Sequence, residues 1–103
     1  MKLITKAVEK KLLSSPLYSR ECDEPENVPV LVKFFFPMGN WTWYVTEAEK
    51  QDDGDWRFFG LVEGFEKELG YFTLSELQSV KKMGLGVERD MYFGGNHTLA
   101  EVM

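Results

Sequence analysis

Three segments rich in β-branched and aromatic residues constrain the fold more than any other feature of this chain. They are VPVLVKFFF at 28–36, WTWYVTE at 41–47 and WRFFGLVE at 56–63. The sequence PMGN at 37–40 predicts a tight turn, because Pro presets its own φ while Gly and Asn tolerate positive φ. A polar loop at 48–55 separates the second and third segments. The pattern predicts an antiparallel meander of three strands.

The two connections predict a register for this meander. If each loop closes symmetrically, large apolar side chains from all three strands lie on one face of the sheet. A shift of one residue would send a whole strand's set to the other face, so the agreement supports the meander. The predicted pairs are Phe36–Trp41, Phe34–Trp43, Val32–Val45, Val45–Trp56 and Trp43–Phe58.

Helical spacing appears on both sides of the meander. Apolar residues recur with helical period over 4–14, and Thr5 is a suitable N-cap. Further on, Thr73 and Glu76 form a capping-box pattern, which predicts a short helix that ends at Gly84.

The last part of the chain predicts one more strand, VERDMYF at 87–93, and a final helical turn after Thr98. Together these elements predict one α+β domain over residues 1–103. Its antiparallel sheet would have three to four strands, a β-meander plus one later strand, with helices packed mainly on one face.

Charge and cysteine content limit the cellular setting. The 103 residues include 17 acidic and 12 basic side chains, a net charge of −5, which disfavours general attraction to nucleic acid. Cys22 is the single cysteine, which fits a reducing compartment. Charges interrupt the first apolar residues, and no run of 18 apolar residues occurs. We therefore expect a cytoplasmic protein that does not contact a membrane.

Several short motifs together resemble a bacterial family known as domain of unknown function 2958. They are KFF at 33–35, GNWTWYVTE at 39–47, LGYF at 69–72, LSEL at 74–77 and ERD at 88–90, of which the second is the most specific. The resemblance implies a bacterial protein often carried on plasmids and other mobile elements. It assigns no activity and no functional residue, and it favours accessory roles such as transfer, maintenance or countering host defence.

Acidic residues gather in two loops. A spaced array of carboxylates can imitate DNA phosphates and occupy a positively charged channel, as in an antagonist of a host defence complex. The alternative is two solvated loops, which is the usual role of such charge runs. The candidate protein-binding residues are Glu21, Asp23, Glu24, Glu26, Glu47, Glu49, Asp52, Asp53 and Asp55.

The second face of the predicted sheet combines aromatic rings with cations. This combination is typical of single-stranded nucleic-acid binding, in which bases stack on rings and cations contact phosphates. The alternatives are a face covered by a helix or a partner subunit, or one that binds protein. The candidate residues are Lys33, Phe35, Tyr44, Arg57 and Phe59, with Lys33, Tyr44 and Arg57 expected in line across the strands.

No pattern predicts a metal, a cofactor or a catalytic centre. The segment DDGD at 52–55 lacks the ligand order of an EF-hand, and His97 with Cys22 offers too few ligands for zinc. We therefore predict a non-enzymatic protein-interaction module that binds another protein. The alternatives are a single-stranded nucleic-acid accessory protein and a small enzyme of unknown class.

Overall fold

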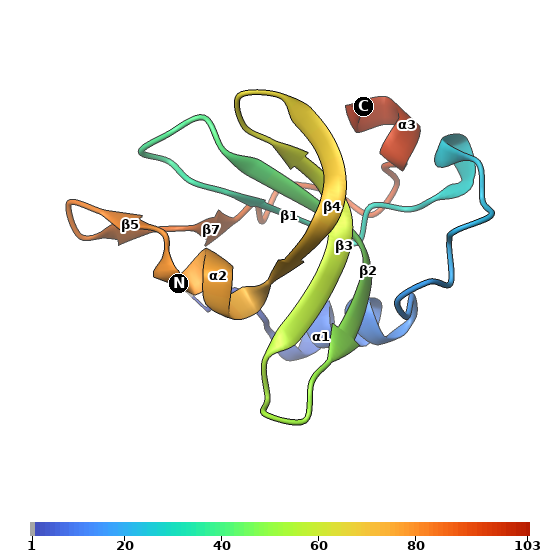
Figure 1. Ribbon diagram of the computed structural model, residues 1–103, viewed down its shortest axis with the longest axis horizontal. Coiled ribbons are helices and arrows are strands. Elements are labelled where there is room, and N and C mark those ends of the chain that lie inside the picture. Colours follow the sequence, from blue (N-terminus) through green and yellow to red (C-terminus); the bar gives the residue numbers. More distant parts are fainter. Residues whose placement is uncertain (1) are drawn as a thin grey trace.

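A five-stranded antiparallel sheet organises the computed structural model, which describes residues 2–103 (Figure 1). The order of strands across the sheet is β4–β3–β2–β1–β7. The strands are β1 Val32–Phe35, β2 Thr42–Lys50, β3 Trp56–Glu63, β4 Lys67–Thr73 and β7 Glu88–Arg89. The α+β class predicted from the sequence is confirmed, although the prediction of three to four strands was too low.

Four short helices and a small ribbon complete the fold of residues 2–103. They are α1 Lys6–Leu13, the 3-10 helix η1 Pro25–Asn27, α2 Leu74–Ser79 and α3 Leu99–Val102, with the ribbon formed by β5 Lys81–Lys82 and β6 Leu85–Gly86. The ribbon projects from the body of the molecule in Figure 1, while α3 lies beside the segment that contains η1. No helix within residues 2–103 is long and apolar enough to span a membrane.

The first hairpin has the predicted register. Val32 pairs with Val45 and Phe34 with Trp43. The N–H of Phe36 donates to the carbonyl of Trp41 at 2.9 Å, which closes the turn at 37–40. Here the period of two and the turn residues were sufficient to predict the structure.

The predicted register of the second hairpin is wrong. Ala48 pairs with Phe58 and Lys50 with Trp56, because β2 continues five residues beyond Val45 and the connecting turn is correspondingly short. The N–H of Gln51 donates to the carbonyl of Asp55 at 2.8 Å to close that turn.

A β-bulge between Val45 and Glu47 compensates for the changed register, so that the apolar side chains of the second hairpin still lie on the predicted face. Val45 pairs with Gly60 but Glu47 pairs with Phe59, so one residue of β2 has no partner. Such an insertion exchanges the two faces of the strand beyond it. Phe58 therefore still lies on the same face as Phe34, which we call the inner face, and Glu47 lies on the opposite, outer face.

The fourth strand is not the one predicted. Residues 67–73 form β4, which pairs along its whole length with β3. The predicted strand 87–93 reduces to Glu88–Arg89, which pairs with β1 at the other edge. The sequence KELGYFT of β4 contains few β-branched residues, so its strand character comes from the neighbouring β3.

The predicted caps at Thr5 and Thr73 are present, whereas Thr98, at the N-cap of α3, makes no side-chain capping hydrogen bond, and α2 is shorter than expected. The Thr5 hydroxyl accepts from the N–H of Val8 at 3.3 Å, and Thr73 accepts from the N–H of Glu76 at 3.1 Å. The helix α2 ends at Ser79 because the chain then forms the β5–β6 ribbon. Gly84, with φ +81°, belongs to the turn of this ribbon.

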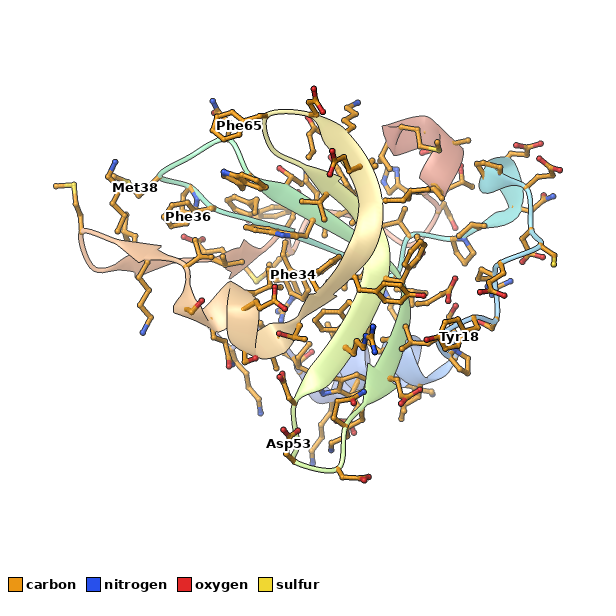
Figure 2. All side chains as sticks on the ribbon, in the orientation of Figure 1. Tyr18, Phe34, Phe36, Met38, Asp53 and Phe65 are labelled. Atoms are coloured by element: carbon orange, nitrogen blue, oxygen red, sulfur yellow. The ribbon has the colours of Figure 1, made fainter. Side chains whose placement is uncertain are left out.

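The two faces of the sheet are packed differently. On the inner face, Phe34 and Phe58 are fully buried in a core that includes residues of α1 and α2. The outer face carries a smaller cluster of Val28, Leu61 and Leu99. The prediction that helices pack mainly on one face holds for α1 and α2, whereas α3 packs on the outer face. Figure 2 shows Phe34 near the centre of the molecule.

Candidate functional site

A pocket of about 400 Å³ lies on the outer face of the sheet. Its floor comes from β2, β3 and β4, and one wall is the loop that connects α1 to β1. Leu99 of α3 also lines the pocket. The lining residues are Tyr18, Arg20, Glu21, Asp23, Pro25, Val28, Thr46, Glu47, Phe59, Leu69, Tyr71 and Leu99.

The β-bulge places Glu47 in this pocket. With regular alternation Glu47 would share the inner face with Val45; the bulge instead sets it opposite Phe59 on the outer face. The Thr46 hydroxyl donates to the carbonyl of Phe59 at 3.1 Å and stabilises the irregular segment. The side chain of Glu47 is only 4% exposed. A carboxylate is thereby held at the floor of the pocket.

The same bulge anchors the loop that forms the wall. The Ser15 hydroxyl donates to the carbonyl of Thr46 at 2.8 Å, and the N–H of Ala48 donates to the carbonyl of Ser15 at 2.9 Å. The N–H of Tyr18 donates to the carboxylate of Glu47. Tyr18 has a φ of +71°, a left-handed conformation that costs a non-glycine residue roughly 1–2 kcal/mol. These long-range bonds hold the loop against the sheet.

Three aromatic rings lie around the pocket. The rings of Phe59 and Tyr71 meet edge to face with centroids 5.0 Å apart, and the ring of Tyr18 lies 6.3 Å from that of Tyr71. The Arg57 guanidinium lies 4.6 Å from the centroid of the Tyr71 ring. Desolvation, followed by hydrogen bonding with Tyr18, raises the pKa of the Tyr71 hydroxyl, so Tyr71 is neutral at pH 7. Figure 2 shows Tyr18 on the α1–β1 loop beside the sheet.

The lining of the pocket is acidic. It contains three carboxylates and one guanidinium, a formal charge of −2. Arg20 pairs with Asp23 at 3.3 Å, and its Nε donates to the Ser15 hydroxyl. Among residues 2–103, no cation forms an ion pair with Glu21 or Glu47. The uncompensated charge favours a cationic ligand.

The first predicted acidic loop lies at this pocket. Glu21 and Asp23 are part of its lining. Glu24 and Glu26 belong to the adjacent segment around η1, where Glu24 is the N-cap residue and its side chain makes no capping hydrogen bond. This predicted loop therefore contributes two lining residues, although the sequence gave no sign of the pocket.

The structure divides the second predicted acidic cluster. Glu47 is buried in the pocket, and Glu49 is exposed on β2 opposite Arg57. Asp52 and Asp53 lie at the tip of the β2–β3 hairpin, where Figure 2 shows Asp53.

Asp55, the last member of that cluster, stabilises α2. Its carboxylate accepts from the N–H of Ser75 at 3.0 Å, from the hydroxyl of Ser75 at 2.7 Å and from the N–H of Trp56 at 2.8 Å. These bonds lower the pKa of Asp55, and the hydrogen bond from the Ser75 hydroxyl has the largest effect. The five residues are thus no single charged array.

The predicted nucleic-acid residues are also divided between two places. Lys33 pairs with Tyr44, but Arg57 lies further along the sheet opposite Glu49, so the expected alignment of these three is wrong. The reason is the register of the second hairpin. Phe59 lies in the pocket, and Phe35 is half-buried at the end of β1.

The C-terminal segment packs against the Lys33–Tyr44 part of the outer face. Lys33 forms an ion pair with Asp90 at 3.4 Å, and its Nζ lies 5.8 Å from the Phe93 ring. The Phe93 ring in turn lies 6.1 Å from that of Tyr44. Burial raises the pKa of Tyr44, with a smaller opposing effect of Lys33. This region has the covered-face arrangement that was the alternative to nucleic-acid binding.

The two residues considered as zinc ligands, His97 and Cys22, have other surroundings. The Nδ1 of His97 lies 3.0 Å from the Glu101 carboxylate, and its ring stacks on Phe93 with centroids 4.2 Å apart. Cys22 is exposed on the α1–β1 loop. Within the part of the chain that the structure describes, no three His, Cys, Asp or Glu side chains are grouped as metal ligands.

The sequence gave no indication of two other exposed regions. Phe65, 97% exposed, lies on the turn between β3 and β4, and its ring is 5.9 Å from that of Trp41 (Figure 2). A hollow of about 510 Å³ lies between Leu3 and the β5–β6 ribbon. Neither contains a buried ionised side chain among its lining residues, which distinguishes the outer-face pocket from both.

Comparison with known proteins identifies the family. The model of the family described as protein of unknown function (DUF2958) matches residues 3–103. The chain belongs to this family. Searches of curated proteins and of solved structures gave no match. The outer-face pocket is therefore the feature of this DUF2958 protein that bears most directly on its function.

Proposed function

We propose that this DUF2958 protein is a non-enzymatic protein-interaction module whose binding site is the outer-face pocket. The observation that supports this most directly is the acidic, aromatic lining around the buried carboxylate of Glu47. A partner protein would contribute a basic, partly apolar segment. The pocket would hold one of its side chains, while the exposed acidic loop around η1 would contact neighbouring basic residues.

The cellular setting is part of the proposal. The resemblance to a bacterial family carried on mobile elements suggests a cytoplasmic accessory protein. Antagonism of a host defence complex is one form of this role, because such complexes expose basic channels to which an acidic surface is complementary. The acidic overall charge of −5 supports a basic partner.

An affinity pull-down from a bacterial host lysate, with and without nuclease, tests this proposal. The wild type would be compared with a pocket-rim variant, Glu21→Gln/Asp23→Asn, and with a matched hairpin variant, Asp52→Asn/Asp53→Asn. Both variants remove two charges from exposed loops. We expect a protein partner that survives nuclease, is retained by the hairpin variant and is lost or depleted with the rim variant.

Two outcomes would contradict the proposal. Equal recovery with the two variants would separate binding from the pocket. Recovery that vanishes with nuclease would favour the alternative, a single-stranded nucleic-acid accessory protein. That alternative has one supporting observation, the Arg57 guanidinium stacked on the partly exposed ring of Tyr71.

A further inference from the structure

The carboxylate of Glu47 has unused capacity to bind a cation. It accepts one hydrogen bond from within residues 2–103, the backbone N–H of Tyr18. An ionised carboxylate has about four lone-pair sites on two oxygens. Among the described residues, every fully enclosed side-chain oxygen has a hydrogen-bond partner, so the unbonded part of the Glu47 carboxylate is not fully enclosed. Because Glu47 lines the pocket, this remaining capacity is directed at the pocket.

The charged side chains that could satisfy Glu47 from within the protein are engaged elsewhere. Arg20 bonds to Ser15 and Asp23. Arg57 lies over the Tyr71 ring and is not among the lining residues. A desolvated carboxylate without a cation is unfavourable, so a ligand that brings a positive charge gains more here than at an exposed glutamate.

The rest of the lining suits the body of such a ligand. Apolar surface from Pro25, Val28 and Leu69 can pack against a hydrocarbon chain. The rings of Phe59 and Tyr71 suit the head group, since aromatic faces attract ammonium and, more often, guanidinium ions. The contact of Arg57 with Tyr71 shows that a guanidinium already stacks on this cluster.

We propose that the outer-face pocket binds the arginine or lysine side chain of a partner protein, with the charged head group on the carboxylate of Glu47 and the aliphatic stem along Leu69 and Val28. This inference rests on the proposed function, which it makes more specific. It defines Glu47, Phe59 and Tyr71 as the residues that recognise the ligand, and it is testable with small probes before any partner is known.

The first experiment compares two probes of nearly the same shape, of which one is charged and the other neutral. N-acetyl-L-arginine amide and its neutral isostere N-acetyl-L-citrulline amide would be titrated into the full chain and followed by amide chemical shifts. We expect the arginine probe to shift Tyr18, Glu47, Phe59 and Tyr71 and to bind roughly tenfold or more tightly than citrulline, as one charge-assisted hydrogen bond would give. N-acetyl-L-lysine amide should shift the same residues.

Matched variants separate the pocket from general charge attraction. Glu47→Gln keeps an acceptor for the Tyr18 N–H, and we expect it to abolish the preference for arginine over citrulline. Glu49→Gln removes an equal charge two residues away on the same face and should leave the preference intact. Tyr71→Leu is a second pocket variant, expected to weaken the arginine probe several-fold while retaining a folded spectrum.

Specific outcomes would overturn the inference. They are equal binding of arginine and citrulline, shifts located away from the pocket, or equal effects of Glu47→Gln and Glu49→Gln. A nuclease-resistant partner lost with the rim variant, together with any of these, would leave the proposed function standing and remove the cation site. Selective arginine binding with no protein partner would do the reverse.

Discussion

The inner and outer faces of the sheet differ in how their aromatic side chains are packed. On the inner face, Phe34 and Phe58 are fully enclosed and their rings lie 6.0 Å apart in a continuous core. On the outer face, Phe59 and Tyr71 form a similar ring pair at 5.0 Å, but they line an open pocket with a carboxylate at its floor. Similar side chains thus stabilise the fold on one face and remain available to a ligand on the other.

The difference between the faces comes from what covers them. Helices α1 and α2 contribute Leu12 and Leu77 to the inner core. The outer face is covered by the C-terminal segment, which packs through Leu99, and beside the pocket by the α1–β1 loop. A loop that is held by a few hydrogen bonds leaves a hollow where a packed helix would not.

The largest expected effect compares two adjacent residues on opposite faces. Phe58→Ala removes a fully buried ring with three aromatic neighbours and should lower the free energy of unfolding by roughly 3–5 kcal/mol. Phe59→Ala removes a half-buried ring and should cost about 1–2 kcal/mol. Urea denaturation of both variants measures the difference. Equal losses would mean that the outer face is as much a core as the inner one.

A second comparison concerns two paired glycines beside the bulge. A Cβ on Gly60 would lie 1.8 Å from the carbonyl oxygen of Tyr44, whereas one on Gly70 would meet no atom within 4 Å. We expect Gly60→Ala to cost roughly 1–3 kcal/mol through forced backbone shifts. Gly70→Ala should be neutral or stabilising by up to about 1 kcal/mol, because alanine loses less backbone entropy. Thermal unfolding of the pair tests this, and a neutral Gly60→Ala would show that the bulge region is adaptable.

Local sequence features predicted the parts of the fold whose causes are local. The first hairpin followed from the alternation in WTWYVTE and from the turn residues at 37–40. The caps at Thr5 and Thr73 followed from residues three positions apart. In each case the interacting groups are neighbours along the chain, so the pattern carries the information.

The bulge and the pocket depend on contacts between distant residues. The bond from Ser15 to the carbonyl of Thr46 joins residues 31 positions apart, and the N–H of Tyr18 reaches Glu47 across 29 positions. No local pattern marks Thr46 as the inserted residue. The position of Glu47 on the outer face, and hence the candidate site, was therefore beyond prediction from alternation alone.

The strand β4 shows a different limit. Its outer-face residues Leu69 and Tyr71 line the pocket. Its sequence, KELGYFT, begins with charged residues and contains a glycine, which is more typical of a loop than of a strand. Pairing with β3 makes it a strand, and that pairing is a property of the assembled sheet. A hint existed in the alternation of Leu69, Tyr71 and Thr73, which occupy one face.

A smaller effect is expected at Asp55, which belongs to the fold and not to the pocket. Asp55→Ala removes acceptors for two N–H groups at the start of α2 and β3 and should cost about 1 kcal/mol, as loss of a cap does. Asp52→Ala, at the hairpin tip, should change stability by less than about 0.5 kcal/mol. Chemical denaturation of both variants at pH 7 measures this contrast.

The contribution of Asp55 should depend on pH in a defined direction. Its pKa in the folded protein is lowered below the ordinary value of 3.8, chiefly by the hydroxyl of Ser75. A group with a depressed folded pKa contributes stability above its unfolded pKa, and the contribution is lost as pH falls through the folded value. The difference between wild type and Asp55→Asn should therefore be constant from pH 7 to about pH 5 and shrink below about pH 4. A difference independent of pH would assign the effect to packing.

The last comparison, at Glu47, distinguishes a binding residue from a structural one. Glu47→Gln removes a charge from a site that is 4% exposed and keeps an acceptor for the Tyr18 N–H. Because the charged form loses solvation in the pocket without gaining a cation, we expect the free energy of unfolding to stay within about 1 kcal/mol of wild type or to rise. Urea denaturation at pH 7 measures it. A loss well beyond that would mean that Glu47 mainly secures the loop at Tyr18. An unchanged or increased stability, together with loss of arginine binding, would show that this carboxylate is kept in the outer face for a ligand.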